Sequence, residues 1–206
     1  MSDGRTPTES ELRAIADECQ HPGVAGMLSD MSDDGLDDYG NVVIHEGDCS
    51  IEGDFDTDDQ ELTALIVRGN LIVSGTFRDR SDDGPTVTVV LGDLRAKNVI
   101  SAGLLEVKGD VVVSEAIVGD YNDGGALIHG DLSVDLFMPV GIAYTVRGDV
   151  SAREQIPGFT ASTDFVPKRL HPRFFAARDD GGADLFAGTA GDTFVDAIAA
   201  GESILS

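Results

Sequence analysis

Cysteines are scarce and long apolar runs are missing in this sequence of 206 residues, and each of these two features excludes a class of protein. The two cysteines, Cys19 and Cys49, are too few for the disulfide framework of a small secreted scaffold. No stretch approaches a run of about 18 apolar residues, the length of a membrane span, and residues 1–7 carry no apolar signal core. The sequence therefore predicts a protein of a reducing compartment, the cytoplasm.

Basic side chains are also few: 14 lysines and arginines stand against 38 aspartates and glutamates, which leaves a net charge of -24. Binding to nucleic acid or to an anionic membrane is disfavoured, because both need a basic surface. Aspartate outnumbers glutamate by 28 to 10, a bias that resembles proteins of salt-loving organisms. An acidic surface that meets a basic partner, and a general gain in solubility, remain two further interpretations.

Motifs that carry chemistry are missing as well. The sequence contains no phosphate-cradling loop, nucleophile elbow or paired Cys and His. The histidines His21, His45, His129 and His171 lack the spacing of metal ligands on a helix. We therefore expect no catalytic, cofactor-binding or metal-binding residues, and no cofactor.

Three acidic segments imitate cation sites incompletely. Residues 30–41 resemble an EF-hand loop but end on Asn41, where a glutamate belongs. The cluster over residues 54–61 lacks the glycine at its sixth place, and residues 181–194 echo a calcium-binding nonapeptide repeat with a broken period. We interpret the first two as a solvated linker and a charged loop, and expect no calcium site in the third.

A corner loop is the best position for catalysis on a polysaccharide, because Asp79, Arg80, Asp82 and Asp83 gather there in the sequence. A short stack of coils offers little groove for a polymer substrate, so we expect no enzyme.

Against these absences stands an internal repeat of the pattern apolar, variable, Gly, Asp or Asn, apolar. It occurs six times, over residues 51–55, 67–71, 90–94, 107–111, 128–132 and 146–150. Successive glycines lie 16, 23, 17, 21 and 18 residues apart. A repeat near this length is typical of a solenoid, in which stacked units share one core.

Alternating apolar positions through every copy indicate strands. The residues two before and two after each glycine form inward columns, and a second apolar patch at 99–100, 117–118 and 137–138 predicts another wall. The sequence therefore predicts an all-β fold, a short right-handed parallel β-helix of about six coils. An antiparallel sandwich is the rival interpretation.

The Gly-Asp pair has a structural explanation. Glycine permits close backbone approach between coils, and Asp or Asn bonds to backbone amides. Stacked carboxylates repel one another by about 1 kcal/mol per pair in water. We expect the residues before glycine, Arg68, Lys108, His129 and Arg147, to offset part of this repulsion.

Both ends of the stack are predicted to carry helical caps. Thr8 and Glu11 form a capping-box pattern for a helix over residues 8–20, which would cover the first coil. Asp192 caps a second short helix that ends before Gly201. The chain thus divides into an N-terminal capping helix with an acidic linker (1–40, the linker at 30–38), the solenoid (41–152), and a C-terminal lid with a capping helix (153–206).

The repeated Gly-Asp-Leu and Gly-Asp-Val units over residues 51–152 resemble those of bactofilins, bacterial polymer-forming β-helix proteins of the cytoskeleton. This resemblance implies a cytoplasmic scaffold that assembles end to end. Unequal coils and capped ends depart from that pattern.

We therefore expect a non-enzymatic solenoid scaffold or protein-interaction module with a strongly acidic surface and a protein partner. The alternatives are an immunity-type or nucleic-acid-mimicking inhibitor of a basic enzyme, and a bactofilin-like filament or homo-oligomer. Membrane and nucleic acid are not expected partners.

Overall fold

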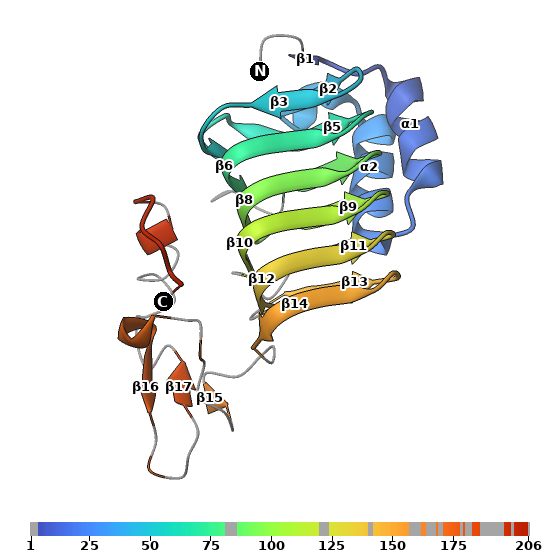
Figure 1. The fold of residues 1–206 in the computed structure, drawn as a ribbon. Coiled ribbons are helices and arrows are strands. Elements are labelled where there is room, and N and C mark those ends of the chain that lie inside the picture. Colours follow the sequence, from blue (N-terminus) through green and yellow to red (C-terminus); the bar gives the residue numbers. More distant parts are fainter. Residues whose placement is uncertain are drawn as a thin grey trace.

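The protein is a β-solenoid of about five turns with two helices along one side (Figure 1). The computed structural model describes residues 4–80, 86–119, 124–139, 142–156, 162–163, 168, 171–177, 179, 183–185, 196–198 and 200–205. The predicted all-β solenoid is confirmed. It has about five turns where the repeat count suggested six coils.

Sheet A forms one wall of the stack. Its strands follow the order β1 (Gly4–Arg5), β2 (Asn41–His45), β5 (Leu62–Val67), β7 (Val87–Val90), β9 (Leu104–Val107), β11 (Gly125–Ile128) and β13 (Ala143–Val146). Neighbours from β2 to β13 pair in parallel, whereas β1 runs antiparallel to β2. The short β1 therefore covers the edge that β2 would otherwise expose.

Sheet B provides two further walls. Its strands follow the order β14 (Val150–Gln155), β12 (Leu132–Met138), β10 (Val111–Gly119), β8 (Leu94–Ser101), β6 (Leu71–Asp79) and β3 (Cys49–Ile51), and β4 (Phe55–Asp56) also pairs with β6. The register shifts after Val73 in β6 and after Val113 in β10, where bulges interrupt the long strands. The second apolar patch predicted from the sequence forms the part beyond these bulges.

The inward columns line up from coil to coil. Val67 pairs with Val90, Val90 with Val107, Val107 with Ile128, and Ile128 with Val146. These residues belong to one apolar core that also holds the inward side chains of sheet B. The prediction that side chains a coil apart touch inside the stack is therefore confirmed.

The predicted first copy of the repeat, residues 51–55, is wrong. His45 pairs with Val67 and Cys49 with Leu71, so residues 45–49 occupy that position. Phe55 instead pairs with Phe77 beyond the bulge, and the two rings stack with centroids 6.2 Å apart. His45 and Cys49 are not aliphatic, which hid the true first copy.

Helix α1 (Glu9–Glu18) begins with the predicted capping box, in which Thr8 and Glu11 bond reciprocally. A second helix, α2 (Pro22–Asp34), was missed, and the short 3-10 helix η1 (Leu36–Asp38) follows it. The expected acidic linker at 30–38 is therefore wrong. Val24, Leu28 and Met31 are fully buried at helical spacing, so the apolar stripe continues into the acidic run.

Both helices cover the outer face of sheet A, which corrects the expectation that a helix covers the first coil (Figure 1). The apolar residues of α1 and α2 pack on outward side chains from β2 to β9, such as Ile44, Ile66 and Val89. Among the described residues, β13 and β14 form the far edges of the two sheets without a further strand. Val150 in β14 is 45% exposed.

The C-terminal part covers the wall beyond the bulges. Its elements are β15 (Ser162–Thr163), η2 (Pro172–Phe174), β16 (Phe175–Ala177) and β17 (Ala183–Leu185). Phe174, Ile198 and Ile204 pack in one cluster with Ile100 and Met138 of the solenoid. The parts that carry these three residues thus lie along the side of the stack, whereas β15, β16 and β17 lie past its β14 end (Figure 1). A helical turn at 196–198 precedes Gly201, whose φ of +72° fits the predicted stop signal, whereas Asp192 lies outside the described residues.

The repeated acidic residue links each coil to the next. Its Oδ1 atom accepts the main-chain N–H of the equivalent residue one coil later, at 2.8 to 3.0 Å. This ladder runs through Asp48, Asn70, Asp93, Asp110, Asp131 and Asp149. Each carboxylate is therefore a hydrogen-bond acceptor at a corner, as the sequence predicted.

Glycine is required where the ladder passes the next coil. A Cβ on Gly109 would lie 2.3 Å from Asp93 Oδ1 and 2.8 Å from the backbone of Gly92, which is too close. Three of the basic residues before these glycines pair with glutamates and not with the aspartates of the ladder. Arg68 pairs with Glu46 at 3.3 Å, and Lys108 and His129 pair with Glu106.

Candidate functional site

One wall of the solenoid is left uncovered by the part of the chain that the structure describes. We call it the bare wall: the outward side chains of sheet B before the bulges. Its central column consists of Ser50, Ile72, Arg95, Val112, Ser133 and Ser151, and all six are exposed. The helices cover sheet A and the C-terminal segment covers the wall beyond the bulges, so this face is the one left open among the described residues.

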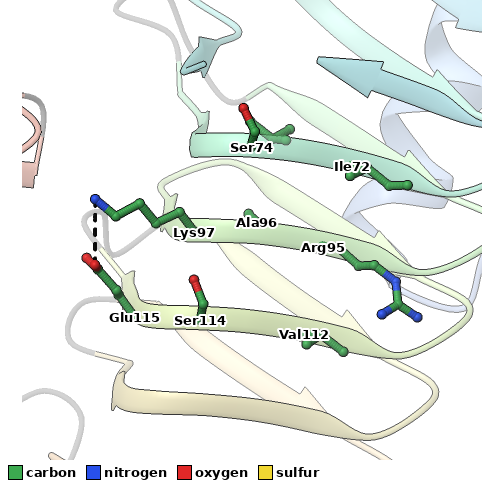
Figure 2. A pocket seen from close by; sticks show the side chains of 9 residues that line it. Ile72, Ser74, Arg95, Ala96, Lys97, Val112, Ser114 and Glu115 are labelled. Carbon is green, nitrogen blue, oxygen red and sulfur yellow. Dashed lines mark ion pairs between the residues drawn. The ribbon is translucent and has the colours of Figure 1, made fainter. Parts of the chain in front are cut away.

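The middle of the bare wall is hollowed. Figure 2 shows Ile72, Arg95 and Val112 one above another on β6, β8 and β10, with Ser74, Lys97 and Ser114 beside them. The hollow measures about 510 Å³ and is open to solvent. Ile72 and Val112 are each 37% exposed, and Val150 is the remaining large apolar side chain exposed to this degree among the described residues.

The charges of the hollow differ from those of the molecule. Its lining includes Arg95, Lys97 and Glu115, a net positive set in a chain of net charge -24. Arg95 bonds to Asp93 at 3.0 Å, and Lys97 lies 3.6 Å from Glu115. Ion pairs this exposed contribute about 0–1 kcal/mol, so another carboxylate can replace either acidic partner at small cost.

The helical layer over sheet A carries an excess of acidic residues. Helix α1 contributes four and α2 contributes three, against the single arginine Arg13.

A buried charge cluster surrounds Glu106 on β9, a residue that the sequence did not single out. Glu106 is 0% exposed and stands in an outward column between Val89 and Leu127. Lys108 Nζ donates to its Oε1 at 2.5 Å, and His129 Nε2 lies 2.8 Å from the same oxygen. Its carboxylate therefore has one side-chain partner on its own coil, Lys108, and one on the next coil, His129.

The connection between α1 and α2 completes this cluster. The backbone N–H of Gln20 donates to Glu106 Oε1 at 2.9 Å, and that of His21 donates to Oε2 at 3.0 Å. Burial alone would raise the pKa of Glu106, but the bonds from Lys108, Gln20, His21 and His129 outweigh it and lower the pKa to about 2. With its acceptor positions filled, Glu106 fastens the helices to sheet A and has no position left for a substrate or metal.

A second buried acid, Asp79, closes the corner after β6. It is 0% exposed and accepts from Ser101 Oγ at 3.1 Å and from the Ala102 N–H at 2.9 Å. Burial raises its pKa to about 7, and these neutral donors lower it only in part. A polysaccharide cannot reach Asp79, and the other acids suggested for that chemistry, Asp82 and Asp83, lie outside the described residues.

The acidic segments that imitate cation sites are engaged elsewhere. Asp30, Ser32 and Asp34 belong to α2 and cannot form an EF-hand loop. Asp54 accepts the Thr76 N–H at 2.7 Å, and Asp56 pairs with Arg78 and Arg80. Residues 181–194 lie mostly outside the described residues. Across the part of the chain that the structure describes, three or more His, Cys, Asp or Glu side chains nowhere gather as a metal site.

Replacing Glu106 tests its role as a fastening. The amide of Glu106→Gln keeps one acceptor and points a donor at the remaining N–H groups, so the free energy of unfolding should fall by about 3 kcal/mol. Hydrogen exchange of the backbone amides should accelerate more in α1 and α2 than in the strands of the solenoid. Glu18→Gln, at an exposed position on α1, is the matched control and should change neither. Equal exchange in both variants would refute the role.

Asp79 gives a prediction about pH. The pKa of Asp79 is about 7 in the folded chain and about 4 when unfolded, so its contribution to stability is complete below pH 4 and is lost as the pH rises to 7. Asp79→Asn should remove this loss, which approaches 1.4 kcal/mol per pH unit in that window. Urea unfolding of both proteins from pH 4 to 8 measures the difference. A difference in unfolding free energy between the two proteins that stays constant from pH 4 to 8 would contradict the raised pKa of Asp79.

Comparisons of the chain with protein-family models, with curated proteins and with solved structures found no match.

Proposed function

We propose that this protein is a non-enzymatic β-solenoid scaffold that binds a protein partner through the bare wall. The observation that carries the proposal is the unequal covering of the three walls. Two of them receive segments of the chain itself, whereas no described segment covers the third, where Ile72 and Val112 are exposed around a hollow. Exposed apolar side chains in a hollow with a polar rim are typical of protein-interaction surfaces.

An acidic, immunity-type or nucleic-acid-mimicking inhibitor is the second candidate. It is supported by the seven acidic residues that α1 and α2 gather over sheet A. Binding through this helical layer would place a basic enzyme against the helices and would weaken steeply with added salt. The surface that a partner contacts therefore separates the two candidates.

Assembly into a bactofilin-like filament or oligomer is a third proposal. The edges of β13 and β14, which pair with no further strand among the described residues, support it, because open strand edges invite another chain. The antiparallel β1 covers the opposite edge of sheet A and opposes simple end-to-end stacking. Electron microscopy of the purified protein distinguishes filaments from single particles.

We place the protein in the cytoplasm. Cys19 and Cys49 are free thiols, and burial raises the pKa of Cys19 to about 12, which keeps it unreactive. Among the described residues, no helix has the length and apolar content of a bilayer span. These thiols support a reducing compartment.

Site-specific photo-crosslinking in cells that express the protein tests the bare wall. A photoreactive residue in place of Ser114 should yield adducts with one protein, and Arg95→Glu should reduce them by about tenfold. The same residue in place of the exposed Ala14 on α1 is the control and should yield none. Adducts from Ala14 alone would favour the acidic inhibitor, and adducts from neither position would refute a partner-binding solenoid.

A further inference from the structure

The column of the bare wall has an unusual order of side chains. Ile72, Arg95 and Val112 stand on three adjacent strands as apolar, cationic and apolar groups. Adjacent strands lie about 4.8 Å apart, so the two apolar groups are about 10 Å apart, with Arg95 on the strand between them. A partner must present apolar groups at this distance and a negative charge midway.

An α-helix meets this spacing better than an extended chain. Residues i and i+7 of a helix are about 10.5 Å apart on one face, with i+3 and i+4 between them. An extended chain places side chains of one face about 6.7 Å or 13.4 Å apart, which fits neither distance.

The chain already uses this arrangement on its opposite wall. Helix α2 runs across the strands of sheet A and buries Val24, Leu28 and Met31, which are spaced i, i+4 and i+7. These side chains pack against outward apolar residues of successive coils, among them Ile66 and Val89. A solenoid wall of this protein therefore accepts a helix laid along the stack.

Charge selects the chemistry of the partner helix. The column on sheet A is apolar where α2 crosses it, whereas the bare wall places Arg95 at the centre and Lys97 beside it. The side chain of Arg95 is 52% exposed and that of Lys97 is 38% exposed, so both can meet a carboxylate. Arg95 pairs with Asp93 and Lys97 with Glu115. Because exposed ion pairs contribute little to stability, a carboxylate of a partner can replace Asp93 or Glu115 at small cost.

We propose that the bare wall binds an amphipathic α-helix of a partner protein, with apolar residues at i and i+7 and an aspartate or glutamate at i+3 or i+4. The acidic residue pairs with Arg95, and the apolar residues cover Ile72 and Val112. This inference rests on the proposed function and names the partner's chemistry.

Two synthetic helical peptides test the proposal. Both carry leucine at i and i+7, and they differ only in glutamate or lysine at i+3 and i+4. The glutamate peptide should shift amide resonances of β6, β8 and β10 in the full-length protein. Arg95→Glu should lower the affinity for this peptide at least about tenfold and make the lysine peptide the tighter ligand.

Arg153→Glu is the matched control, because Arg153 is 68% exposed on the same sheet but does not line the hollow. It should leave both affinities unchanged, and circular dichroism should confirm that each variant is folded. Equal binding of the two peptides, no binding of either, or shifts on α1 and α2 would overturn the helix proposal. Self-association that Arg95→Glu abolishes would assign the hollow to a second copy and also overturn it.

The outcomes separate this inference from the proposed function. Crosslinks from position 114 without peptide binding would support the partner-binding scaffold and would refute an amphipathic helix with an acidic residue as its ligand. Peptide binding that obeys the charge reversal, without a crosslinked partner in cells, would support the helix-binding surface and reject the proposed cellular role.

Discussion

One side-chain hydrogen bond recurs between successive coils of the solenoid: the Asp or Asn after each repeat glycine accepts the main-chain N–H of the same position one coil later. This bond explains both members of the Gly-Asp pair. The carboxylate or amide oxygen points along the stack, and the next coil passes so closely that a Cβ would collide with it. Because the bond fixes which residues face each other across coils, the apolar columns inside the stack align as a consequence.

The stack then determines how the rest of the chain is used. Sheet A and the part of sheet B beyond the bulges both present apolar side chains outward, and such surfaces are unfavourable in water. The N-terminal helices cover the first and the C-terminal segment covers the second. Glu106 secures the helices by accepting hydrogen bonds from the α1–α2 connection, from Lys108 on its own coil and from His129 on the next coil. No described segment covers the bare wall, where serines and charged groups surround the exposed Ile72 and Val112, and this is the surface that we propose for a partner.

The sequence predicts the repeat, the inward columns, the second apolar wall and the capping box of α1, because each depends on local spacing. It misplaces the first coil, because His45 and Cys49 are not aliphatic, whereas the residues that pair with them, Val67 and Leu71, are. Helix α2 had a detectable signal in Pro22 after His21 and in the spacing of Val24, Leu28 and Met31, but the acidic run concealed it. The roles of Glu106 and Arg95 could not be predicted, because they depend on which wall each covering segment selects, and a strand pattern specifies only inside and outside.

The most direct test of the account compares Asp110→Asn with Asp110→Ala by urea unfolding. Asp110 Oδ1 accepts the Asp131 N–H at 2.9 Å, and Asn70 already fills the equivalent position two coils earlier. Asparagine keeps the acceptor and removes one charge from a column of like charges, so the account predicts unchanged or higher stability. Alanine removes the acceptor and should cost about 1 kcal/mol or more. Equal losses in the two variants would contradict a ladder held by neutral acceptor geometry.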